Sequence, residues 1–157
     1  MLFSTKAEYG VRLMVELGRQ PGSQPVSLGS VAEAENLPLS YLEHLVAKLR
    51  KAGLVTSTRG AHGGYRLAKP AGEITMDAVV EALEGQIAPM ECFHVTREGK
   101  VQCSHEVDGD HACATKLLWT RVQNGVTKAL AGTTLAELVE FSDHSAPKRA
   151  AALGSAA

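Results

Sequence analysis

The 157-residue chain has few features that would tie it to a membrane or to the cell exterior. No apolar run approaches the length that crosses a bilayer. The first residues, MLFSTKAEYGVRLM, lack the basic start, apolar run and cleavage site of a signal peptide. There are only three cysteines, an odd number, in a chain long enough to bury a core without disulfides. These absences predict a cytoplasmic protein without a membrane partner, whose thiols serve metal binding or redox chemistry.

The chain also lacks a strong net charge, which is −1 at pH 7. Its charges are nevertheless unevenly distributed. Residues 1–70 carry nine Lys and Arg against five Asp and Glu, whereas residues 71–112 carry two against nine. Residues 113–157 are again basic, with five against three. The first segment could therefore face a phosphate backbone while the acidic middle faces away from it.

Signatures of enzymes are missing as well. No nucleophile stands at a recognisable spacing from a base, and no glycine-rich phosphate loop leads into a helix. The glycines of GAHGGY lie between two short apolar segments, so we interpret them as part of a turn. We therefore predict that the protein is not an enzyme.

The pattern of apolar residues predicts mostly helices. Helical segments are expected from Ser4 to about Arg19, in SLGSVAEAENL after the capping residue Ser27, and over residues 39–52, where Gly53 ends the helix. LVTST and YRLA flank the turn RGAHGG and predict a hairpin. ITMDAVVEALEG predicts a further helix, with Thr75 as its cap.

The second half of the chain is divided by a cysteine-bearing loop, ECFHVTREGKVQCSHEVDGDHAC, which contains every cysteine of the sequence. A long helix is expected from Cys113 to about Leu130, then a short one in TTLAELVEF and a mobile tail. The predicted units are residues 1–86, 87–112 (the loop), 113–142 and 143–157.

Three helices followed by a hairpin are typical of a winged helix-turn-helix domain. We therefore predict a mainly α fold with a small β-hairpin wing and a long helix after it. The start of the 39–52 helix would enter the major groove of DNA, and the glycine-rich wing tip would approach the backbone or minor groove. The candidate DNA-binding residues are Ser40, Tyr41, Glu43, His44, Lys48, Arg50, Lys51, Arg59, Gly60 and His62, with Lys6 and Arg66 as further phosphate contacts.

The sequence LSYLEHLVAKLRKAGLVTSTRGAHGGYRLAKP resembles the recognition helix and wing of a regulator family that includes the iron–sulfur regulator IscR and the nitric-oxide sensor NsrR. The resemblance extends through STKAEYGVRLM, EITMDAVVEALEG and TTLAELV, over roughly residues 1–142. It implies a homodimer joined by the long helix, which serves as a dimerisation helix. It also implies binding to double-stranded DNA at an imperfect palindrome.

Cluster-bearing members of this family hold iron and sulfide with three loop cysteines and one ligand that is not cysteine. The resemblance therefore implies Cys92, Cys103 and Cys113 as ligands of a [2Fe–2S] or [4Fe–4S] cluster. A histidine that some members place three residues after the last cysteine is Lys116 here. An acidic ligand supplied by the partner subunit in other members corresponds to Glu8. His105 and His111 compete for that role, and Glu8 could instead pair with Arg12.

The function expected from this resemblance is transcriptional repression, with operator affinity controlled by a cluster that senses redox state, nitric oxide or iron–sulfur supply. Two alternatives keep DNA binding without the cluster. In one, Cys103 and Cys113 form a disulfide in a thiol-redox switch. In the other, thiols and imidazoles of the loop bind zinc, although a close C-x2-C pair is missing.

Overall fold

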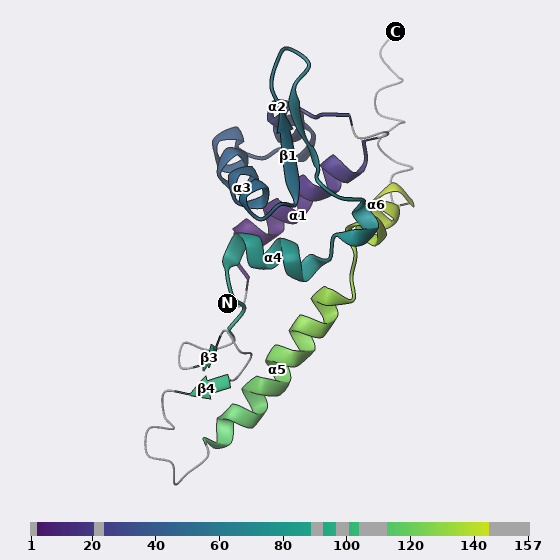
Figure 1. Ribbon diagram of the computed structural model, residues 1–157. Helices are drawn as coiled ribbons and strands as arrows, with labels where there is room; N and C mark the ends of the chain where they lie inside the picture. Colours follow the sequence, from purple (N-terminus) through teal and green to yellow (C-terminus); the bar gives the residue numbers. More distant parts are fainter. Residues whose placement is uncertain (1–2, 21–23, 89–92, 97–100, 104–112, 145–157) are drawn as a thin grey trace.

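The computed structural model describes residues 3–20, 24–88, 93–96, 101–103 and 113–144. It confirms a mainly helical chain with a β-hairpin (Figure 1). In chain order the elements are α1 Thr5–Gly18, α2 Leu28–Glu35, α3 Leu39–Lys51, β1 Val55–Thr58, β2 Gly64–Leu67, the 3-10 helix η2 Ala71–Glu73, α4 Met76–Glu84, β3 Phe93–Val95, β4 Val101–Cys103, α5 Ala114–Ala131 and α6 Leu135–His144.

The first helix is capped from two directions. Ser4 caps α1, and its Oγ accepts a hydrogen bond from the Lys6 amide at 3.2 Å. Glu84, at the end of α4, adds a second cap: its Oε1 accepts from the Ser4 hydroxyl at 2.6 Å and from the amides of Ser4 and Ala7. Burial raises the pKa of Glu84, but these hydrogen bonds and the charge of Lys6 outweigh it and leave the pKa below its ordinary value. The start of α1 is thus fastened to the end of α4.

The helix-turn-helix consists of α2 and α3. Ser27 caps α2 as predicted, with its Oγ accepting from the Ser30 amide at 3.1 Å. Asn36 then adopts a left-handed conformation with φ 52°, which ends α2. The Leu37 amide donates to the Ala32 carbonyl across this turn at 3.0 Å. The turn reverses the chain so that α3 packs against α2 and α1.

The wing is an antiparallel hairpin with Val55 opposite Leu67 and Thr58 opposite Gly64. The segment before α2 continues this sheet, because the amides and carbonyls of Val26 and Tyr65 exchange two hydrogen bonds of 2.8 Å. The wing is therefore held at its base by the segment that leads into the helix-turn-helix.

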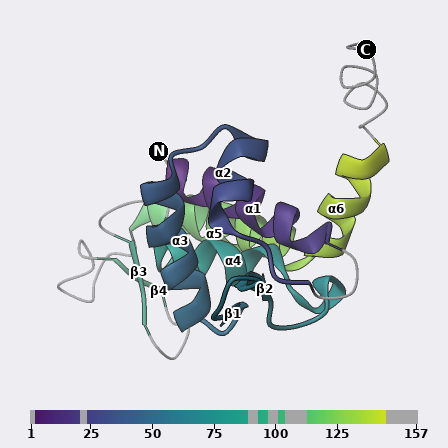
Figure 2. The ribbon, with the colours of Figure 1, turned by 90° about the horizontal axis from the view of Figure 1, so that it is seen from above.

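One hydrophobic core joins the N-terminal helices to the last helix. Helix α1 lies between α3 and α6, as both views show (Figures 1 and 2). Leu135, at the start of α6, is fully buried, and its amide donates to the Ile74 carbonyl at 2.8 Å. Thus α6 packs with the winged domain although α5 separates the two in sequence. The core residues are Leu13, Met14, Leu17, Leu28, Val31, Leu37, Leu42, Leu45, Val46, Leu49, Leu54, Val55, Ile74, Met76, Val79, Leu83 and Leu135.

Helix α5 contacts α4 and extends beyond the winged domain (Figure 1), and none of its residues is buried. Strands β3 and β4 pair antiparallel, with Phe93 opposite Cys103, inside the segment that we expected to be a loop. Three-residue strands are too short to give a readable alternation of apolar residues, so the sequence did not indicate them. Within the described part of the chain, no helix is both long and apolar enough to span a bilayer.

Two details at helix ends differ from the sequence prediction. Thr75 precedes α4, but its side chain does not cap the helix; its hydroxyl donates instead to the Asp77 carboxylate. Asp77 Oδ1 also accepts a hydrogen bond from the Ala78 amide at 2.8 Å. The acidic side chain thus supplies an acceptor to an amide of the first turn, where a negative charge is favourable. At the other end of the chain α6 continues to His144, two residues into the segment predicted as a tail. The rest of that segment lies outside the described residues.

Candidate nucleic-acid interface and cysteine site

Helix α3 presents one polar face and buries the other. Its apolar stripe is formed by Leu42, Leu45, Val46 and Leu49, each at most 2% exposed. The candidate residues on the opposite face are exposed: Ser40, Glu43, His44, Lys48, Arg50 and Lys51. The amphipathic spacing read from the sequence is therefore confirmed. This face carries three basic side chains in its last turn and one acidic side chain, Glu43.

Tyr41 differs from its neighbours on this helix. It is half-buried, and its ring meets that of Tyr9 on α1 edge to face, with centroids 5.7 Å apart. Its hydroxyl lies 3.5 Å from Thr5 Oγ1. Tyr41 thus helps to set the position of α3 on α1, a structural role that the sequence did not reveal.

Lys48 also has a partner within the chain. Its Nζ donates to the Leu83 carbonyl in the last turn of α4 at 2.8 Å. An ammonium group is favourable at a helix C-terminus, where carbonyls are unpaired and the helix dipole is negative. This contact joins the recognition helix to the helix that leads into the cysteine-bearing segment.

The wing tip is exposed at Arg59, Gly60 and His62, as the predicted DNA contacts require. Its shape depends on small residues. A Cβ atom at Gly63 would lie 2.2 Å from the Thr58 carbonyl oxygen, so the two sides of the turn approach too closely for any side chain. Arg50 Nη1 also donates to Ser57 Oγ at 3.4 Å, which links α3 to β1. The recognition helix and wing are therefore held as one surface.

The structure brings two of the three predicted thiol ligands together. Cys103 ends β4 and Cys113 immediately precedes α5; both side chains are half-buried. Hydrogen bonds from the Thr115 hydroxyl, the Cys103 thiol and the Lys116 amide lower the pKa of the Cys113 thiol. Cys113 Sγ lies 3.2 Å from Thr115 Oγ1. Cys92 lies outside the described residues, so this pair is the described portion of the predicted ligand set.

Among the predicted fourth ligands, only Glu8 lies in a described segment; His105 and His111 lie outside. The side chain of Glu8 is 62% exposed, and its Oε1 is 3.9 Å from Arg12 Nη1. Arg12 makes its shorter contacts with α2, since its Nε donates to Glu35 Oε2 and its Nη2 to the Glu35 carbonyl, both at 2.7 Å. Glu8 is thus accessible to another molecule. Considering the described segments alone, no three His, Cys, Asp or Glu side chains are grouped to hold a metal.

Helix α5 exposes an apolar surface. Leu117 is 62% exposed and Leu118 55% exposed, both close to the cysteine end of the helix. Both are large apolar side chains on a helix that has no buried residue.

A comparison with models of protein families shows which family the chain belongs to. The model of the Rrf2 family, described as an iron-dependent transcriptional regulator, matches residues 3–141. The chain belongs to the Rrf2 family. This confirms the resemblance proposed from the recognition helix and wing, and it confirms a DNA-binding transcriptional regulator rather than an enzyme.

Relatives within the Rrf2 family are similar along most of their length. The transcriptional regulator CymR of Bacillus subtilis is 39% identical over 143 residues, which cover 91% of this chain and 93% of CymR. IscR of Serratia proteamaculans is 36% identical over 143 residues, 91% of this chain and 82% of that protein. Both relatives are transcriptional regulators that this chain matches along most of its length.

Solved Rrf2-family structures confirm the winged helix-turn-helix fold. CymR of B. subtilis, described as the global cysteine regulator, superposes with a TM-score of 0.72 at 39% identity, covering 90% of this chain and 98% of that one. T. potens IscR gives a TM-score of 0.73 at 34% identity, covering 95% and 93%.

Proposed function

We propose that this Rrf2-family regulator is a homodimeric repressor in the cytoplasm whose operator affinity is controlled by an iron–sulfur cluster. The observation that carries the proposal is the meeting of Cys103 and Cys113 at the start of α5. Two half-buried thiols in contact, one fixed at a helix end, fit the thiolate ligation that such clusters require. When bound, the cluster supplies a centre that responds to redox state, to nitric oxide or to iron–sulfur supply.

The remaining ligands in this proposal are Cys92 and Glu8, the latter from the partner subunit. The exposure of Glu8 supports this role, because an exposed carboxylate can reach a second chain without first breaking a short contact. The exposed Leu117 and Leu118 support pairing of the α5 helices. A ligand donated by α1 of one subunit to α5 of the other would tie the recognition helices to the dimer axis.

This coupling has a path within each subunit. Glu84 fastens the start of α1 to the end of α4, and Lys48 fastens α3 to the same turn through the Leu83 carbonyl. A constraint placed on α1 at Glu8 would therefore act on the recognition helix. Regulation then requires that the cluster bind one dimer geometry more tightly than the other.

The direct test compares the protein with and without its cluster. Anaerobically purified protein should contain matched iron and sulfide, and selection from random duplexes should yield an imperfect palindrome. We expect the affinity for that palindrome to differ at least about fivefold between the loaded protein and the same protein after iron chelation. A colourless protein without iron after reconstitution, or equal affinities for the two forms, would refute the proposal.

The DNA contacts are tested by the salt dependence of binding. We propose that the wing residue Arg59 contacts a phosphate, so Arg59→Gln should reduce the slope of log affinity against log salt by about one. The matched control is Arg121→Gln, which removes the same charge from an exposed site on α5. If both variants change the slope equally, the effect is one of net charge and Arg59 is not a specific contact.

A second candidate function is a cluster-free thiol switch. The same contact between Cys103 and Cys113 favours it, because two neighbouring thiols can lose two protons and two electrons to a peroxide and form a disulfide. A similar solved structure, 38% identical, is described as the oxidised form of Staphylococcus aureus CymR. Zinc binding by the cysteine-bearing segment is the other cluster-free alternative. Metal analysis of the purified protein separates the three.

A further inference from the structure

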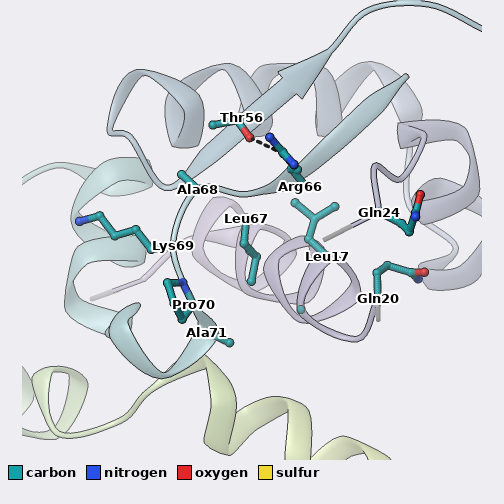
Figure 3. A pocket seen from close by; sticks show the side chains of 11 residues that line it. Leu17, Gln20, Gln24, Thr56, Arg66, Leu67, Ala68, Lys69, Pro70 and Ala71 are labelled. Atoms are coloured by element: carbon teal, nitrogen blue, oxygen red, sulfur yellow. Dashed lines mark hydrogen bonds between the residues drawn. The ribbon is translucent and has the colours of Figure 1, made fainter. Parts of the chain in front are cut away.

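A hollow of about 550 Å³ lies between the C-terminal end of α1, the wing and the segment that leads into η2. Its lining combines apolar side chains, including Leu17, Leu67 and Pro70, with the polar side chains of Gln20, Gln24 and Thr56. Figure 3 shows the side chains of Leu17 and Leu67 next to each other at its centre, with Pro70 to one side. A space of this size and character is suited to a small organic molecule. The DNA contacts proposed on α3 and at the wing tip lie outside it, whereas Arg66, a further predicted phosphate contact, lines it.

The charge of the lining favours an anion. Arg66 and Lys69 line the hollow, and no Asp or Glu does so among the described residues. Arg66 Nε donates to Thr56 Oγ1 at 3.3 Å, and this bond holds the guanidinium above Leu17 (Figure 3). Lys69 points away from the centre in the same view, so it adds positive potential and no direct contact. Arg66 is therefore the anchoring cation.

The backbone supplies a second donor. The amide and carbonyl of Tyr65 bond to Val26 and so point away from β1. The direction of the backbone amide and carbonyl recurs at every second residue of a strand. The amide and carbonyl of Leu67 therefore also point away from β1, toward the hollow. Within the described part of the chain, the Leu67 amide has no hydrogen-bond acceptor on that side. A strand-edge amide beside a guanidinium is a favourable site for a carboxylate.

We propose that this hollow binds a small carboxylic acid with a short aliphatic body. Its carboxylate accepts hydrogen bonds from Arg66 and from the Leu67 amide, and its carbon chain lies on Leu17 and Leu67. Apolar contact with the floor distinguishes such a ligand from inorganic phosphate or a DNA phosphate, which would use only Arg66. Because α1 and both strands of the wing line the hollow, an occupant would restrict movement of the wing relative to α1 and so alter DNA affinity.

The probe for this site is hexanoate. Its binding is monitored in the backbone amide spectrum of the full-length protein labelled with 15N. Hexanoate at millimolar concentration should shift the Leu67 amide resonance along a saturable curve. Acetate lacks the carbon chain and hexan-1-ol lacks the charge, so each should bind at least about fivefold more weakly. Arg66→Gln should weaken hexanoate binding about tenfold, as expected for loss of a hydrogen bond to a charged group.

Two further variants make the result specific. Arg121→Gln on α5 removes the same charge far from the hollow in sequence and should leave hexanoate binding unchanged. Arg66→Lys keeps the charge but loses the two-pronged donor geometry, so its affinity should lie between those of wild type and Arg66→Gln. Unchanged amide positions outside the wing would show that Arg66→Gln is folded.

Several outcomes would overturn the proposal: no saturable shift of the Leu67 amide, equal binding of acetate or hexan-1-ol, or hexanoate affinity unaffected by Arg66→Gln. In the last case a reduction of about one in the salt slope of DNA binding would assign Arg66 to a phosphate instead.

Discussion

Cys103→Ala is expected to leave the protein colourless, with iron and sulfide at least about tenfold lower than in wild type after identical anaerobic purification. Cys103 ends β4 and its thiol contacts Cys113, so its removal takes away one thiolate and leaves the other without its neighbour. Neither side chain belongs to the hydrophobic core, and the winged domain should therefore remain folded. The measurements are the ultraviolet–visible spectrum and the iron and sulfide contents.

Companion variants test whether the loss of colour in Cys103→Ala reflects the loss of a cluster ligand. Asn124→Ala, at an exposed position of α5, should retain its iron, since it changes neither thiol nor core. Cys113→Ala should behave like Cys103→Ala. Glu8→Ala should still assemble the cluster but should lose it more readily than wild type. A brown Cys103→Ala protein with normal iron content would exclude Cys103 as a ligand.

The thiol-switch alternative predicts a different result from the same proteins. Wild type would be colourless, and peroxide treatment would lower its mass by two hydrogens. Cys103→Ala would show no such loss. A single set of preparations therefore separates the two functions.

Gly64→Ala is expected to lower the free energy of unfolding by about 2–4 kcal/mol and to loosen the wing. Gly64 has φ 154°, a conformation that residues with a Cβ atom rarely adopt. An added Cβ would lie 2.4 Å from the carbonyl oxygen and 2.6 Å from the carbonyl carbon of Val26. Both are backbone atoms held by the hydrogen bonds to Tyr65, so no side-chain rotation relieves the overlap.

Chemical denaturation of the cluster-free protein measures this loss, and hydrogen exchange locates it. Exchange at the Val26 and Tyr65 amides should accelerate more than exchange in α1, because the bridge between the wing and the segment before α2 would open first. DNA affinity should fall with it, as the wing tip carries Arg59.

Two glycine controls separate backbone strain from steric overlap as the cause of the lost stability. Gly60 also has a positive φ, 116°, but a Cβ there would meet nothing within 4 Å. Gly60→Ala should therefore cost only the conformational strain of the backbone, about 1 kcal/mol. Gly125→Ala lies inside α5 in open space and should stabilise the helix by about 0.5–1 kcal/mol. If Gly64→Ala proved no more costly than Gly60→Ala, close approach of the Val26 backbone would not be the reason for glycine at this position.

The sequence by itself determined the local structure and the family. Apolar spacing placed α1, α3 and α5 within one or two residues of their ends, and Ser27 marked the start of α2 correctly. The polar face of α3 and the glycine-rich wing tip followed from the same patterns. These features depend on neighbours within a few residues, which a sequence displays directly.

Contacts between distant parts of the chain were decided only by the tertiary structure. Lys48 was predicted from the sequence as a DNA contact, yet its ammonium group also binds the Leu83 carbonyl 35 residues away. Glu84 caps α1 from 80 residues away. The meeting of Cys103 with Cys113 and the hollow beside Arg66 arise in the same way. Such pairs depend on how helices and strands pack, and spacing along the chain does not encode which side chains packing brings together.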